Sequence, residues 1–146
     1  MEKHKYFDGK NWLTVHKNVN LVHYLLNGVF HRLDGPARIF NYQNGNVLKE
    51  LYYENGILHR LDGKPSYIMY HKNGIIKSKE YYKNGILHKE DGPAEIRYDK
   101  NGNIEVQQYW LNGKLINKKQ LEKIGIDLNN IPFTKSDMTK FKLTFG

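Results

Sequence analysis

Three His-x-x-Asp motifs hold the side chains best suited to chemistry in this chain. They are His31 with Asp34, His59 with Asp62, and His88 with Asp91. A histidine beside a carboxylate can ligate a metal or act as a general base. The alternative role is structural: the aspartate accepts backbone hydrogen bonds in a turn, and the histidine packs beside it. We favour this repeat-structural role because an active site normally occupies one place, whereas the pair recurs. The sequence therefore predicts no catalytic residue, no metal ligand and no cofactor.

Aromatic residues recur at two neighbouring positions and define a second candidate site. This candidate interaction face consists of Tyr24, Tyr52, Tyr53, Tyr81, Tyr82, Tyr109 and Trp110. Aromatic side chains on a sheet can stack nucleic-acid bases when cations lie nearby. They can also pack as a ladder between neighbouring hairpins. Residues 21–113 carry twelve basic and ten acidic residues, and this near-neutral charge disfavours phosphate binding there.

Asn-Gly dipeptides show that these residues belong to a repeat. The dipeptide occurs seven times, at intervals of 17, 11, 18, 11, 17 and 11 residues, which gives a period of 28 to 29 residues. Periods of this size are typical of repeat arrays. Asn-Gly between apolar residues indicates a hairpin, because a type I′ turn needs positive φ at both central residues. Each repeat should therefore contribute two hairpins.

The repeat predicts an all-β fold, an antiparallel meander of tandem hairpins in which about ten short strands form an elongated twisted sheet. Asp-Gly dipeptides close to a proline mark a further turn in each repeat. We assign residues 1–20 to a degenerate N-terminal half-repeat or cap, and residues 21–116 to three or four hairpin repeats. Residues 117–146 form a basic, partly helical C-terminal cap. Its first helix should begin after Asn117 and end near Gly125, and a second should be capped by Thr134 or Ser136.

Composition narrows the functional classes. The chain has 146 residues, 23 Lys and Arg against 15 Asp and Glu, a net charge of +8 and no cysteine. The lack of cysteine excludes disulfides and thiol catalysis. Most of the cations are lysines, which recognise bases less well than arginine does. We find neither an apolar stretch of roughly 18 to 20 residues nor a signal-like apolar segment, and expect a cytoplasmic protein without membrane insertion.

The motif Y-x-x-N-G-x-L-H-R-x-D-G-P-A resembles variant MORN-like repeats over residues 22–116. Such repeats occur in bacterial proteins of the YwqK type, which are antitoxin-like, and in proteins of large DNA viruses and phages. The HRxDGPA form is most similar to the viral and phage version. The resemblance implies a hairpin array with an interaction role, acting on a host or virion partner in the cytoplasm of a host cell.

The leading hypothesis is thus a non-enzymatic protein-interaction scaffold whose partner is a protein. Exposed sheet edges could also accept a partner strand or pair with a second copy. Two alternatives stay open. One is a nucleic-acid-binding protein that uses the basic ends and the sheet aromatics, and the other is an enzyme or metal site built on a His/Asp pair.

Overall fold

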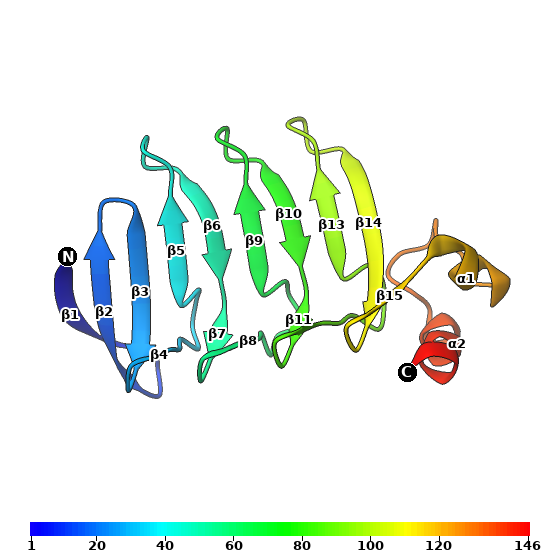
Figure 1. The fold of residues 1–146 in the computed structure, drawn as a ribbon, viewed down its shortest axis with the longest axis horizontal. Coiled ribbons are helices and arrows are strands. Elements are labelled where there is room, and N and C mark those ends of the chain that lie inside the picture. The colour runs from blue at the N-terminus through cyan, green and yellow to red at the C-terminus, as the bar shows by residue number, and fades with distance from the viewer.

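The computed structural model describes residues 1–146 as one long antiparallel sheet with two short helices at its C-terminal end (Figure 1). The elements are β1 (Glu2–Phe7), β2 (Trp12–Asn18), β3 (Leu21–Leu26), β4 (Val29–Phe30), β5 (Arg38–Asn41), β6 (Val47–Leu51), β7 (Tyr53–Glu54), β8 (Ile57–Leu58), β9 (Tyr67–Tyr70), β10 (Ile76–Glu80), β11 (Tyr82–Lys83), β12 (Ile86–Leu87), β13 (Glu95–Tyr98), β14 (Ile104–Leu111), β15 (Lys114–Ile116), α1 (Lys118–Lys123) and α2 (Lys135–Phe145). The predicted all-β hairpin meander is confirmed. The strands outnumber the expected ten because five two-residue strands, β4, β7, β8, β11 and β12, lie off the ten-strand path of the main sheet.

Each repeat combines a long hairpin with a short one. The main sheet has the order β1-β2-β3-β5-β6-β9-β10-β13-β14-β15, and β4 pairs with β3 at its side. The short hairpins β7–β8 and β11–β12 form separate two-stranded sheets. Figure 1 shows the long hairpins pointing the same way, with the short ones gathered at the opposite end. Equivalent positions of successive repeats therefore lie side by side.

The Asn-Gly turns are of two types. Both central residues have positive φ at Asn27-Gly28, Asn55-Gly56, Asn84-Gly85 and Asn112-Gly113, as a type I′ turn requires. Only the glycine has positive φ at Asn44-Gly45, Asn73-Gly74 and Asn101-Gly102. The prediction of a type I′ turn is therefore wrong for these three. Their hairpins close with a longer loop and a shift in register, which is the pattern of a type I turn followed by a glycine bulge.

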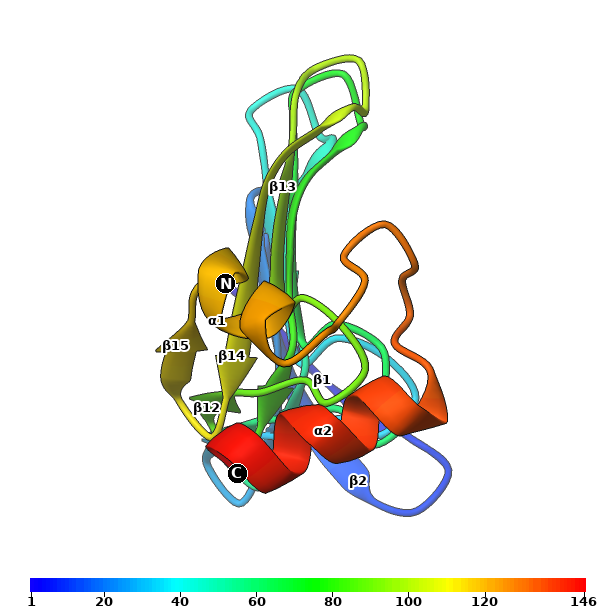
Figure 2. The same ribbon diagram turned by 90° about the vertical axis from the view of Figure 1, so that its right-hand side faces the viewer.

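The largest buried cluster lies where the tail covers the last strands. Its members are Tyr109, Leu111, Ile116, Leu121, Ile126, Phe133 and Phe141. Figure 2 shows both helices at this end of the array. Asn117 caps α1 through a capping box with Gln120, and Thr134 rather than Ser136 caps α2 in the same way. No helix is both long enough and apolar enough to cross a membrane.

Candidate interaction surface

Three loops carry the His-x-x-Asp motifs and link each short hairpin to the next long strand. We name them L1 (residues 31–36), L2 (residues 59–65) and L3 (residues 88–93), and together the loop row. L2 is one residue longer than L1 because Lys64 is inserted between its glycine and proline. The repeat places the three loops side by side at the short-hairpin end of the sheet (Figure 1).

The motif histidines join one repeat to the next. The Nδ1 atom of His31 accepts a hydrogen bond from the backbone N–H of Asn55 at 3.0 Å. The same bond recurs from Asn84 to His59 at 3.2 Å, and from Asn112 to His88 at 3.1 Å. Each histidine thus satisfies a backbone donor in the type I′ turn of the following repeat. This contact explains why the histidine recurs.

The motif aspartates pair with a basic neighbour rather than with their histidines. Asp34 pairs with Arg32 at 2.7 Å, Asp62 with Arg60 at 2.8 Å, and Asp91 with Lys89. Partial burial alone would raise the pKa of Asp62, but the backbone N–H of Lys64 and the Arg60 guanidinium hold it below the ordinary range. No three His, Asp or Glu side chains gather as metal ligands would. The structure therefore brings each motif into one loop but separates the two functional groups.

The first row of predicted aromatics, Tyr24, Tyr52, Tyr81 and Tyr109, lies beneath side chains of the protein itself. Arg32 covers the ring of Tyr24 at 4.0 Å, and Arg60 covers Tyr52 at 3.9 Å. The Nζ atom of Lys89 lies 4.9 Å from the ring centre of Tyr81. Burial raises the pKa of Tyr52, so its phenol stays neutral beside the arginine. The fourth member, Tyr109, is 1% exposed and belongs to the buried cluster.

The second row contains Tyr53, Tyr82 and Trp110, and its contacts are different. The ring of Tyr53 lies 5.4 Å from that of Phe30. Tyr82 donates its hydroxyl hydrogen to Glu80 at 2.8 Å, and the indole N–H of Trp110 lies 3.2 Å from the side-chain oxygen of Gln108. Tyr109 and Trp110 are consecutive in β14, so their side chains point to opposite faces. The seven predicted residues thus divide between two rows.

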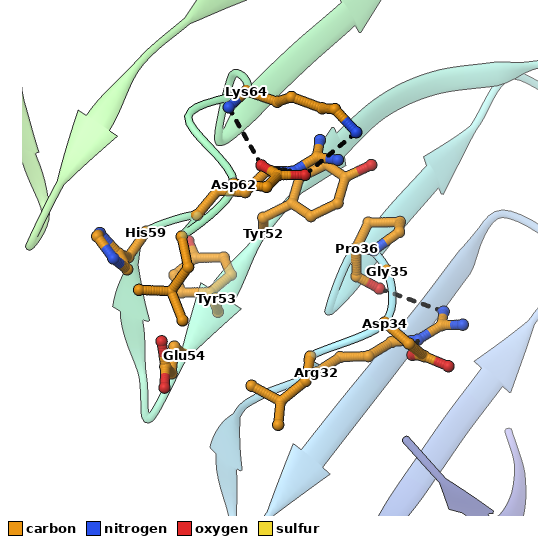
Figure 3. A pocket seen from close by; sticks show the side chains of 13 residues that line it. Arg32, Asp34, Gly35, Pro36, Tyr52, Tyr53, Glu54, His59, Asp62 and Lys64 are labelled. Carbon is orange, nitrogen blue, oxygen red and sulfur yellow. Dashed lines mark hydrogen bonds and ion pairs between the residues drawn. The ribbon is translucent and has the colours of Figure 1, made fainter. Parts of the chain in front are cut away.

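Two grooves separate the loops. The first, between L1 and L2, has a volume of about 450 Å³ and is lined by Leu33, Pro36, Tyr52, Tyr53 and Leu61 among others (Figure 3). The second, between L2 and L3, has a volume of about 630 Å³. Its lining includes Leu61, Tyr81, Tyr82 and, from α2, Met138. Leu61 contributes to both grooves.

Sequence reasoning did not identify Leu33, Leu61 and Met138 as parts of a site. Leu61 is 76% exposed and Leu33 is 40% exposed. Both occupy the variable position of the HRxDG motif, where L3 has Glu90. The sequence feature that could have identified Leu33 and Leu61 is an apolar residue inside an otherwise polar turn. Met138 could not be placed because the tail lies outside the repeat.

Comparisons with family models, with curated proteins and with solved structures each returned no match.

Proposed function

We propose that this protein is a non-enzymatic protein-interaction scaffold and that the loop row is its binding surface. The observation that carries the proposal is the contrast within the loops. Their histidines, arginines and aspartates are engaged in contacts that hold the repeat, whereas Leu61 stands exposed between two open grooves. An exposed leucine between two grooves that combine tyrosines with charged side chains suits a protein contact, whose centre is apolar and aromatic and whose rim is polar.

The contacts of the aromatic and histidine residues support this function over the alternatives. The faces of Tyr24, Tyr52 and Tyr81 are covered by cations of the same chain, which leaves less ring surface for stacked bases. A general base needs an unprotonated nitrogen that faces its substrate, but the Nδ1 atom of each motif histidine accepts a backbone hydrogen bond, which places the proton of the neutral ring on Nε2. These contacts favour an interaction role over nucleic-acid binding and over catalysis.

The sheet edges are less suited to binding than the loop row. The edge strand β1 carries Lys3 and Lys5, and lysine on an edge strand opposes pairing with another strand. At the other end, β15 and the tail cover residues 109–111 of β14, which leaves only residues 104–108 of that strand as an open edge. We therefore favour the loops over the sheet edges as the binding surface.

The repeat motif adds a biological context to this proposal. Its likeness to the MORN-like repeats of viruses and phages supports a role on a host or virion protein. The site of action would then be the cytoplasm of the host cell, and an antitoxin-like role belongs to the same class.

A two-hybrid screen of protein fragments against the full chain tests the proposal. We expect partners whose signal is lost in Leu61→Asp and kept in Val19→Asp. Val19 is a matched control because it is 85% exposed in the turn between β2 and β3, away from the loop row. Partners that tolerate Leu61→Asp, or a screen that yields none, would contradict the proposed surface.

A further inference from the structure

Leu61 divides the loop row into two grooves, each with a mixed lining of charged, aromatic and aliphatic side chains. It lines both the first and the second groove and is 76% exposed. Tyr52 and Tyr53 lie in the first groove, as Figure 3 shows, and Tyr81 and Tyr82 occupy the equivalent positions of the second. A chain that crosses L2 can therefore place one apolar side chain on each side of Leu61.

The chain's own tail shows how a segment contacts such a loop. Met138 of α2 contributes an apolar side chain to the second groove. One turn further along α2, Lys142 pairs with Glu90 of L3 at 2.8 Å. The contact thus combines an apolar side chain in a groove with an ion pair on the loop. L2 has Leu61 where L3 has Glu90, so the loop between the two grooves offers an apolar contact in place of a charged one.

The two grooves differ in charge. The first is balanced, with Arg32, Arg60 and Lys64 against Asp34, Glu54 and Asp62. The second groove carries a surplus of positive charge. Its lining has four cations, Arg60, Lys64, Lys83 and Lys89, and two acids, Glu90 and Asp91. Asp62 and Lys142, which pair with lining residues from outside the groove, add one acid and one cation. Asp62, Glu90 and Asp91 are each paired already. Lys83 is exposed and takes part in no ion pair. The second groove therefore has a cation available for an incoming carboxylate.

We propose that the occupant of the loop row is an acidic peptide segment that carries two apolar side chains. One apolar side chain enters each groove beside Leu61, and a carboxylate next to the second one pairs with Lys83. This inference rests on the proposed function and specifies the chemistry of its partner. The overall charge of +8 adds a favourable long-range attraction for an acidic segment.

A random-peptide library displayed on phage and selected on the full chain provides the probe. The enriched sequences should share two apolar residues with Asp or Glu beside one of them. A fluorescein-labelled synthetic peptide of the enriched sequence is then titrated in fluorescence anisotropy. We expect the affinity to fall by at least about tenfold in Leu61→Asp and in Lys83→Glu. Val19→Asp and Lys100→Glu are the matched controls and should bind as the wild type does, with circular dichroism verifying that all four variants fold.

The outcomes separate this inference from the proposed function. The inference would be overturned if the enriched peptides lack acidic residues and bind Lys83→Glu as well as the wild type. If those peptides still lose affinity in Leu61→Asp, the loop row remains the binding surface. Peptides that bind equally well to Leu61→Asp would overturn both. A failure to enrich any peptide would count against both as well. Restored binding of Lys83→Glu to a peptide in which the acid is replaced by Lys would establish the ion pair.

Discussion

Phe133 stacks on Tyr109, with ring centres 5.8 Å apart and planes only 5° from parallel. The equivalent tyrosines Tyr24 and Tyr52 are covered instead by Arg32 and Arg60 of their own repeats. The fourth repeat has no such loop, because the chain leaves the repeat after Ile116. Phe133 therefore takes the place of the missing cation. Its backbone N–H also donates to the carbonyl of Asp91 at 2.7 Å, which ties the tail to L3.

Replacing Phe133 should destabilise the whole array. Phe133 is 4% exposed and belongs to the main buried cluster, so Phe133→Ala should lower the free energy of unfolding by about 3 to 5 kcal/mol. Leu143→Ala is the control, because Leu143 lies in the same tail but is 84% exposed, and should change stability by less than about 0.5 kcal/mol. Urea denaturation measures both. Equal effects of the two changes would mean that the stack does not hold the tail.

Each motif histidine should contribute to stability in the same direction. His59→Ala leaves the backbone N–H of Asn84 without its partner, which should cost about 1 kcal/mol or somewhat more. His31→Ala and His88→Ala remove equivalent bonds, and the cost should be largest for His31, which is 3% exposed. His4→Ala, in the exposed strand β1, serves as control. A histidine whose removal leaves stability unchanged but abolishes a biological activity would revive the enzyme hypothesis.

The two turn types should respond differently to loss of asparagine. Asn84 has a φ of 53°, a conformation that alanine adopts at a cost of roughly 1 to 2 kcal/mol. Asn101 in the same repeat does not have positive φ, so Asn101→Ala should cost clearly less. Thermal unfolding of the two variants provides the comparison. Indistinguishable losses would argue against the assignment of two turn types.

Acid should weaken the contact between the tail and L3. The hydrogen bond from Lys142 is the main reason why the pKa of Glu90 lies below its ordinary value. A carboxyl with a lowered folded-state pKa adds stability above its unfolded pKa, and this contribution is lost as pH falls through the folded pKa. Stability should therefore decline below about pH 4.3, and the decline should be shallower in Glu90→Gln. Urea denaturation between neutral pH and pH 3 measures the difference, and identical pH profiles would exclude this ion pair as a contributor.

The purified protein should be a monomer free of nucleic acid. Lysines on β1 oppose pairing at that edge, and β15 with the tail covers residues 109–111 of β14, so only the short open edge at residues 104–108 remains and we expect no self-pairing. We expect light scattering to give a mass near 17.2 kDa at low and high salt, with a 260/280 absorbance ratio typical of protein. An oligomer that persists in high salt would point to the sheet edges. A 260/280 absorbance ratio that is high at low salt and falls to the value of pure protein at high salt would favour nucleic-acid binding.

The repeat made much of the fold predictable from sequence. The Asn-Gly spacing was enough to predict the hairpins, and the caps at Asn117 and Thr134 followed from local side-chain chemistry. The turn types did not follow, because Asn44-Gly45 and Asn55-Gly56 look alike and only the register of the flanking strands distinguishes them. The hydrogen-bond partners of the histidines could not be predicted either, because each hydrogen bond comes from a backbone N–H of the next repeat.

The candidate site was less predictable than the fold. The repeat spacing placed the aromatic residues at equivalent positions, but their division into two rows depends on the contacts that each ring makes in the fold. The cations that cover the first row come from the loops, and no pattern in the sequence links Arg60 to Tyr52. The importance of Leu61 emerges only when adjacent loops create grooves on both of its sides.

Hydrogen–deuterium exchange on the complex with an enriched peptide tests most directly whether the loop row is the binding surface. We predict slower amide exchange on binding in residues 59–65 and 88–93, with no change in the turns at residues 42–46 and 71–75 at the far end of the hairpins. Protection confined to β1, or to those distant turns, with exchange in L2 and L3 unaltered would contradict the account.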